Sequence, residues 1–385
     1  MKFLHLGDLH IGKSIGDFDL IEDQKYILDQ MMDIVEKNNI DAVLVAGDVY
    51  DKSVPSEAAV KLFDYFICRL AEKEIKAFII TGNHDSDERM NFGSNLFKAN
   101  NIFISAKYEG TLCKQTLEDA NGVINVYLMP FIKASQVRHY YPDEKITNYD
   151  EAVRVVLKKS NINPKERNLL VAHQFVAGKT SDPQLGGSES VSTQNVGLVE
   201  KIGADCFTDF DYVALGHIHS SQSVERPEIR YAGSPLKYSL SEADNKKFAT
   251  IVEFGKKGDV KIELEPLCPM RDLRHIRGRM EQLLAKETIS APDDFIYVTL
   301  TDEELIDNVM GIFQQHYPNT VRIEYDNSHT KELQQLDISQ VVENKKFSDI
   351  ITDFYKLVYG CDINEDEIKL MNEVAREAGI VNETD

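Results

Sequence analysis

The stretch KFLHLGDLH, residues Lys2–His10, joins a short apolar run to an acid and an imidazole. The same plan recurs in AVLVAGDVYD, Ala42–Asp51, and in AFIITGNHD, Ala77–Asp85. Short apolar runs rich in β-branched and aromatic residues are typical of buried strands. The acids, the histidines and an asparagine therefore follow directly on predicted strands. We expect them to lie beside one another at one edge of a sheet.

Helical patterns separate these three runs. The intervals Leu20–Glu36 and Ser56–Glu74 have apolar residues at helical spacing, and Pro55-Ser56 is a typical helix start. Strands that alternate with helices indicate βαβ units around a largely parallel sheet. The predicted fold class is therefore α/β.

A second series of strands is predicted between Thr111 and Pro266. Two of them end at further histidines, since Leu169–Ala172 leads to His173 and Tyr212–Leu215 leads to Gly216-His217-Ile218-His219. The other strands of this region are predicted at Val123–Leu128, Ile229–Ala232, Thr250–Phe254 and Val260–Leu264. We expect this series to form a second sheet packed on the first.

The pattern changes after Pro266. A strand, helix, strand, helix, strand order is predicted in Leu273–Ile276, Met280–Ala285, Phe295–Leu300, Asp302–Gln315 and Val321–Tyr325. Two amphipathic helices are predicted further on, at Phe347–Val358 and Asn364–Ala378. We therefore predict three parts: a large domain over residues 1–267, a small α/β domain over 268–330, and a linker with a helical pair over 331–385.

The composition limits the classes of function. With 43 basic against 64 acidic residues the formal charge is −21. Phosphate contacts depend on Lys and Arg, so any DNA contact must be local. Five scattered cysteines without a CxxC pair indicate reduced thiols. No early signal peptide and no stretch of ~20 apolar residues is evident, so we predict a cytoplasmic protein without a membrane span.

The side chains at the strand ends have the chemistry of a transition-metal site. Asp8 and His10 lie two residues apart, so in an extended chain they point to one side and can hold one ion. The two oxygens of Asp48 can bridge two cations about 3.5 to 4 Å apart. Carboxylate, imidazole and amide donors together suit Mn²⁺, Fe or Zn²⁺ better than Mg²⁺ or Ca²⁺. The further neutral donors are Asn83, His173, His217 and His219.

The order of the blocks, DxH, GDxxD, GNHD, H and GHxH, is similar to the signature of calcineurin-like metallophosphoesterases. Taken singly, an Asp at a strand end is more often a turn former and a lone His a satisfied polar group. The presence of all five blocks in this order favours a metal site instead. Lys52–Ala58 resembles the nuclease branch of this superfamily, and Phe210–His219 and Tyr231–Ser239 look like the bacterial SbcD nucleases. The resemblance extends over nearly the whole chain.

The resemblance implies an α/β/β/α sandwich of two sheets, a small α/β capping domain and a C-terminal helical pair. It also implies two divalent ions, with Mn²⁺ as the metal. The ligands it assigns are Asp8, His10, Asp48 and His219 for one ion, and Asp48, Asn83, His173 and His217 for the other. His84 is then the acid at the leaving oxygen, and Asp51 is expected to orient its imidazole. Asp85 is expected to bind a backbone amide of its own turn.

Basic and aromatic residues near these blocks are candidates for DNA contact. They are Lys13, Lys52, Arg89, Lys179, Lys237 and Tyr238, the last as a stacking platform. Solvated surface is the alternative for each of them, and the sequence leaves both open. The interval Lys179–Gly197 has little periodicity and is predicted to be a long loop beside His173.

The function that the resemblance implies is a metal-dependent DNA nuclease of repair and recombination. It would act on double-stranded ends, single strands and hairpins, together with a coiled-coil, SMC-like ATPase of the SbcC type. A small-nucleotide phosphodiesterase, or mainly a scaffold for the ATPase, are the alternatives. The segment Phe347–Ala378 is expected to dock on the ATPase, although its apolar stripes can equally pack on the chain itself. A homodimer within a heterotetramer is implied by the family alone.

Overall fold

The computed structural model describes residues 1–179, 182–185, 201–328, 349–352, 355–356 and 362–377. The chain divides into two compact units, Met1–Arg274 and His275–Asp385. The three-part division with boundaries after residues 267 and 330 stays a prediction.

The first unit contains two six-stranded sheets, in the orders β16-β15-β1-β4-β5-β6 and β13-β14-β12-β9-β8-β7. The first is formed by β1 (Lys2–Leu6), β4 (Ala42–Ala46), β5 (Lys76–Ile80), β6 (Ile102–Ser105), β15 (Phe248–Phe254) and β16 (Val260–Pro266). The second is formed by β7 (Cys113–Asp119), β8 (Gly122–Met129), β9 (Arg167–His173), β12 (Tyr212–Gly216), β13 (Gln222–Val224) and β14 (Arg226–Tyr231). Short pairs complete the strands: β2 (Ser14–Ile15) with β3 (Phe18–Asp19), and β10 (Val176–Ala177) with β11 (Ile202–Gly203).

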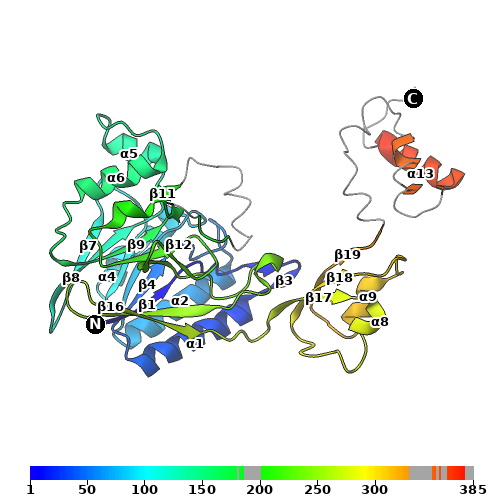
Figure 1. The fold of residues 1–385 in the computed structure, drawn as a ribbon, viewed down its shortest axis with the longest axis horizontal. Coiled ribbons are helices and arrows are strands. Elements are labelled where there is room, and N and C mark those ends of the chain that lie inside the picture. Colours follow the sequence, from blue (N-terminus) through cyan, green and yellow to red (C-terminus); the bar gives the residue numbers. More distant parts are fainter. Residues whose placement is uncertain (180–181, 186–200, 329–348, 353–354, 357–361, 378–385) are drawn as a thin grey trace. The chain divides into compact units, whose positions relative to one another are not determined.

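Helices cover the outer face of each sheet (Figure 1). α1 (Ile21–Asn38) and α2 (Glu57–Glu72) lie on the first sheet, and α5 (Ala134–Tyr140) and α6 (Tyr149–Lys159) lie on the second. Two short helices, α3 (Asp87–Asn91) and α4 (Ser94–Lys98), follow β5. A buried apolar layer, with Phe3 and Phe78 from one sheet and Leu169 from the other, joins the two sheets. These layers confirm the predicted α/β/β/α sandwich.

The predicted parallel order is found in β1, β4, β5 and β6. The prediction for Thr250–Phe254 and Val260–Leu264 was wrong in one respect, because these strands extend the first sheet rather than the second. β15 pairs antiparallel with β1, and β16 pairs with β15. Alternating apolar residues identify a strand but not its neighbour. Here Phe254 packs edge-on against Phe3, with ring centroids 5.4 Å apart.

The second unit contains a three-stranded sheet in the order β17-β18-β19. Its elements are β17 (Leu273–Gly278), α8 (Met280–Leu283), β18 (Phe295–Leu300), α9 (Val309–Gln314) and β19 (Thr320–Tyr325). This is the predicted order, but α9 begins later than the expected Asp302, because Asn308 before it adopts a left-handed φ of 49°. The helix α13 (Glu365–Glu377) lies within the predicted Asn364–Ala378. Half of the predicted helix Phe347–Val358, and most of the loop Lys179–Gly197, lie outside the described residues.

Two expectations from the composition can be compared with the described residues. The cysteines that the structure describes, Cys68, Cys113, Cys206 and Cys268, are free thiols, and Cys361 lies outside the described part. Within the described ranges, no helix is long and apolar enough to cross a membrane.

Candidate metal centre

The candidate ligands follow strands whose ends meet at one edge of the sandwich. Parallel pairing of β1 with β4 and of β4 with β5 aligns three strand ends, and parallel pairing of β9 with β12 aligns two more. The side chains placed there are Asp8 and His10 after β1, Asp48 after β4, Asn83 after β5, His173 at the end of β9, and His217 and His219 after β12. The sandwich thus brings together residues that are far apart in sequence.

The backbone at four of these positions is strained. Asp8, His10, Asp48 and His217 have φ values of 52°, 43°, 48° and 98°. Such conformations cost non-glycine residues about 1–3 kcal/mol each, and they persist only where the surroundings hold them. Here the Asp8 and His10 amides donate to the carbonyls of Gly47 and Asp48, at 3.1 and 2.9 Å. Strain concentrated at one edge of the fold is typical of a functional site.

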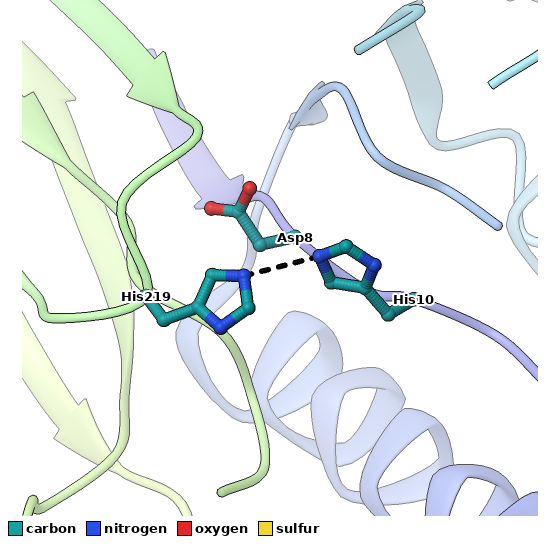
Figure 2. A group of neighbouring side chains, drawn as sticks. All are labelled: Asp8, His10 and His219. Carbon is teal, nitrogen blue, oxygen red and sulfur yellow. Dashed lines mark hydrogen bonds between the residues drawn. The ribbon is translucent and has the colours of Figure 1, made fainter. Parts of the chain in front are cut away.

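The first group consists of Asp8, His10 and His219, and Figure 2 shows a nitrogen of the His10 ring directed toward a nitrogen of the His219 ring. The Nε2 atoms of His10 and His219 are 3.1 Å apart. Asp8 Oδ1 accepts a hydrogen bond from the His217 amide at 2.8 Å, but the buried Asp8 Oδ2 has no partner among the described residues. A buried orphan oxygen beside two imidazole nitrogens fits a cation, since burying an unsatisfied carboxylate oxygen is otherwise costly.

The second group contains Asp48, His173, Asn83 and His217. Asp48 Oδ2 lies 3.4 Å from His173 Nε2 and 3.6 Å from His10 Nε2, so this oxygen stands between the two groups. Asn83 Oδ1 lies 3.0 Å from both His173 Nε2 and His217 Nδ1. This arrangement is the one expected if two ions share the Asp48 carboxylate and if Asn83, His173 and His217 are the further donors to the second ion. The fold and these carboxylate and imidazole clusters support divalent metal ions.

Hydrogen bonds from outside the cluster fix the rings of two histidines. His173 Nδ1 donates to the Ala46 carbonyl at 2.8 Å, which leaves Nε2 free to act as a ligand. His219 Nδ1 lies 3.3 Å from Glu242 Oε1, and Lys247 Nζ lies 2.6 Å from Glu242 Oε2. Glu242 is fully buried. Sequence reasoning missed Glu242 and Lys247, because neither stands in a motif or at a recognisable spacing.

Three glycines leave the space that these side chains occupy. A Cβ on Gly82 would come within 2.1 Å of Asp48 Oδ1, and one on Gly47 within 2.5 Å of His173 Nδ1. A Cβ on Gly216 would lie 1.9 Å from the Ala46 carbonyl oxygen. The glycines of the GD, GN and GH pairs therefore allow the strand ends to approach one another.

Burial and charge set the protonation of the metal-free cluster. Burial lowers the pKa of His217 to about 3, and the charge of His173 adds to this effect. Burial likewise raises the pKa of Asp8 to about 6, against the charges of His173 and His219. For His173, burial acts to lower the pKa, but the adjacent Asp48 and Asp8 carboxylates outweigh it and raise the pKa to about 9. His173 and Asp48 therefore form an ion pair in the metal-free protein.

We expect the affinity for a divalent ion to increase with pH up to about pH 9. Below that value His173 is protonated, and an ion that takes its Nε2 must displace the proton. The affinity should rise by up to about tenfold per pH unit between pH 7 and 9 and then level off. Calorimetric titration at several pH values, in buffers of different ionisation enthalpy, measures both the affinity and the released proton. An affinity independent of pH in this interval would contradict the His173 ligand.

His84 is placed beside the cluster, half-buried, with its ring edge-on to His10 at 4.8 Å. Its Nδ1 lies 2.9 Å from the backbone carbonyl oxygen of Asp51. The prediction that the Asp51 carboxylate orients His84 is therefore corrected, because the main chain provides the contact. The carboxylate instead pairs with Lys13 Nζ at 2.8 Å. Asp85 accepts a hydrogen bond from the Gly82 amide of its own turn, as predicted, and two more from the amides of Val49 and Tyr50.

The candidate DNA contacts fall into two classes. Lys52, Arg89 and Lys179 are exposed. Lys13 and Lys237 are engaged, Lys13 with Asp51 and Lys237 with Asp272. The stacking role predicted for Tyr238 is not supported, since only 5% of this residue is exposed and its hydroxyl donates to the Leu9 carbonyl.

A recess of about 300 Å³ opens beside Asn83. Phe131 and Lys133 are among the residues that line it, together with the acidic residues Asp87 and Glu88. The Phe131 ring stands edge-on to His173, with centroids 6.3 Å apart. Sequence reasoning did not single out Phe131 or Lys133, because only the fold brings the segment after β8 to the cluster.

Comparison with known proteins relates this geometry to a family. Residues 1–221 match the family of calcineurin-like phosphoesterases, and residues 269–359 match the type 5 capsule protein repressor C-terminal domain. Over 357 residues the chain is 33% identical to the SbcD subunit of the nuclease SbcCD from Staphylococcus epidermidis, covering 89% of this chain and 92% of that protein. The chain belongs to the SbcD family of calcineurin-like phosphoesterases. The resemblance stated from the motifs is thereby confirmed.

Two solved phosphoesterase structures are more distant from this SbcD-family chain. A dimetal phosphatase from Danio rerio is 11% identical with a TM-score of 0.39, over 70% of this chain and 96% of that one. Yfce, a phosphoesterase from E. coli, is 12% identical with a TM-score of 0.27, over 70% of this chain and 100% of that one. Likenesses this distant add nothing to the family assignment.

Proposed function

We propose that this SbcD-family chain is a DNA nuclease that depends on two divalent ions, with Mn²⁺ as the metal. The observation that carries the proposal is the position of Asp48 Oδ2, 3.4 and 3.6 Å from imidazole nitrogens of the two donor groups. The ligand sets are those given above, with Asp48 shared. The Staphylococcus epidermidis relative is a subunit of a nuclease, which supports nuclease activity. Action on double-stranded ends, hairpins and single strands is part of the proposal.

The chemistry divides between the ions and the chain. Bound divalent ions would lower the pKa of water and neutralise charge on a phosphate diester. His84 carries the proton transfer at the leaving oxygen. Because Nδ1 is held by the Asp51 carbonyl at 2.9 Å, Nε2 is the ring atom left to hold and deliver a proton. The half-buried position of His84 gives Nε2 access to a substrate that lies on the cluster.

DNA contact is proposed for the exposed basic residues around the cluster, Lys52, Arg89 and Lys179. The recess beside Asn83 adds Phe131 as a surface for a base and Lys133 as a phosphate contact. In a chain with a formal charge of −21, these contacts would supplement the charge of the bound ions.

A nuclease assay on blunt, hairpin and single-stranded DNA, with and without Mn²⁺ and the partner ATPase, tests the proposal. Cleavage is expected only with the divalent ion. Far higher activity on cyclic nucleotides or nitrophenyl diesters would favour a small-nucleotide phosphodiesterase instead. A chain that binds fewer than about one ion when Mn²⁺ is added would favour a scaffold, since the mechanism needs both ions.

The proposed partner is an SbcC-type coiled-coil ATPase, which would dock on residues 347–378. The match of residues 269–359 to a C-terminal domain family supports a separate role for this part of the chain. On α13, Leu370 and Val374 are exposed, with 60% and 54% of their surface accessible, so they are available to a partner. Deleting residues 347–378 should abolish co-purification with the ATPase and leave metal binding unchanged. Equal recovery of the ATPase with the truncated chain would contradict this docking site.

A homodimer within a heterotetramer, located in the cytoplasm, is part of the same proposal. Phe92 and Leu96, in the segment of α3 and α4, are 84% and 75% exposed. Two large apolar side chains exposed within five residues of sequence offer a surface that a second copy would cover. Sedimentation equilibrium of the purified chain decides between monomer and dimer.

A further inference from the structure

The segment Cys268–Asp272, which leads into β17, is hydrogen-bonded and ion-paired to α1. Gln30 exchanges two hydrogen bonds with the backbone of Cys268, at 2.9 and 3.3 Å. About two turns earlier on the helix, Asp23 pairs with the guanidinium of Arg271. Arg271 Nε lies 3.1 Å from Asp23 Oδ1. Asp23 is only 1% exposed. A buried carboxylate needs its ionic partner, so the position of Arg271 and the position of this part of α1 depend on each other.

The next residue on α1 holds the His10 loop. Gln24 is 2% exposed, and its Nε2 donates to the His10 carbonyl at 2.7 Å. Its Oε1 accepts from the Gly12 amide at 2.9 Å. Because Asp23 and Gln24 are consecutive residues of one rigid helix, a displacement at Asp23 moves the support of His10.

A second pair of consecutive residues makes the same connection. Lys237 Nζ lies 2.9 Å from an Asp272 carboxylate oxygen. Its neighbour Tyr238 donates from its hydroxyl to the Leu9 carbonyl at 2.5 Å, and its ring stands edge-on to His10 at 5.6 Å. Two adjacent residues of the segment, Arg271 and Asp272, are therefore linked by separate routes to the backbone of residues 9 and 10.

We propose that Arg271 and Asp272 are positioning residues for the metal centre, which set the place of the His10 loop through Asp23-Gln24 and Lys237-Tyr238. This rests on the proposed role of His10 as a ligand. The left-handed φ of 43° at His10 needs surroundings that hold it, and both routes end at this loop. A movement of the chain where it enters β17 then alters the geometry of the ligands. The ATPase, acting on the C-terminal part, would have a physical route to the metal centre.

Hydrogen exchange in the full-length, metal-free chain tests the proposal. In Arg271→Met and in Asp272→Ala, the amides of residues 9–13 should exchange about tenfold faster than in the wild type, while those of β7 and β8 stay unchanged. The Mn²⁺ dissociation constant, followed by electron paramagnetic resonance, should increase about three- to tenfold. Arg271→Lys keeps the charge opposite Asp23 and should restore much of the protection. The matched control is Arg154→Met, which removes an arginine of α6 that pairs with Asp150 and Asp205.

Three outcomes would overturn the proposal: unchanged exchange in residues 9–13, faster exchange throughout the first unit, or the same effect in Arg154→Met. If Arg271→Met does not fold, Asp272→Ala and Arg271→Lys carry the test alone. The exchange measurement needs no metal. If the wild-type chain failed to bind Mn²⁺, the proposed function would therefore be excluded. Faster exchange in the variants would still support the coupling between Arg271-Asp272 and the His10 loop.

Discussion

Replacing Asp48 with asparagine is expected to reduce phosphodiesterase activity by on the order of 10³-fold, about 4 kcal/mol of transition-state stabilisation. Asp48 Oδ1 accepts the His84 amide hydrogen at 2.9 Å, and an asparagine would keep its oxygen there. Its NH₂ group would then take the place of Oδ2, which faces His10 Nε2 and His173 Nε2. An amide nitrogen offers neither charge nor a usable lone pair to an ion. The site would lose the atom shared by its two donor groups.

The measurement combines elemental analysis of bound metal with kcat/KM on DNA and on a nitrophenyl diester. Asp41→Asn is the matched control, because Asp41 is exposed and its carboxylate accepts only the Lys2 amide among the hydrogen bonds found for it, at 2.7 Å. It should retain wild-type activity and metal content. An Asp48→Asn chain within tenfold of wild-type activity, with full metal content, would exclude the bridging role.

The sequence predicted the part of the site that depends on local order. A motif that directly follows an apolar strand must lie at the end of that strand, and parallel pairing then aligns neighbouring ends. Asp8, Asp48 and Asn83 could therefore be placed together from the residue pattern alone, and β1, β4 and β5 confirm the arrangement. Their individual roles as ligands stay predictions.

Contacts between distant segments could not be predicted in this way. Glu242 reaches His219 from the short 3-10 helix Leu240–Glu242 after β14, and Tyr238 reaches Leu9 across more than two hundred residues. Nothing in residue type or spacing marks either as part of a metal centre. The sheet to which β15 belongs could not be predicted either, because the apolar pattern of β15 is compatible with both sheets. The predicted contact between the Asp51 carboxylate and His84 was wrong, because a sequence does not show whether the side chain or the backbone carbonyl of a residue makes a contact.

Replacing His84 with alanine is expected to lower kcat by about 10²- to 10⁴-fold while the bound metal stays the same. His84 lies close enough to His10 and Asp48 to be grouped with them as a third donor, so geometry alone also allows a ligand. Its Nδ1, however, is engaged by the Asp51 carbonyl at 2.9 Å, and its ring is half-buried at the edge of the cluster. Alanine keeps the backbone amide that binds Asp48 Oδ1 at 2.9 Å, so the shared carboxylate should remain in place.

Metal content is the measurement that separates the two roles of His84. A proton donor can be removed without loss of an ion, whereas removal of a ligand lowers the affinity for the ion and the rate together. The loss of rate should also be smaller for a diester with a nitrophenolate leaving group, because that oxygen leaves without a proton. His139→Ala, an exposed histidine on α5, is the control and should change neither quantity. If His84→Ala binds one ion fewer than the wild type, His84 is a ligand, and the proton at the leaving oxygen must come from another group.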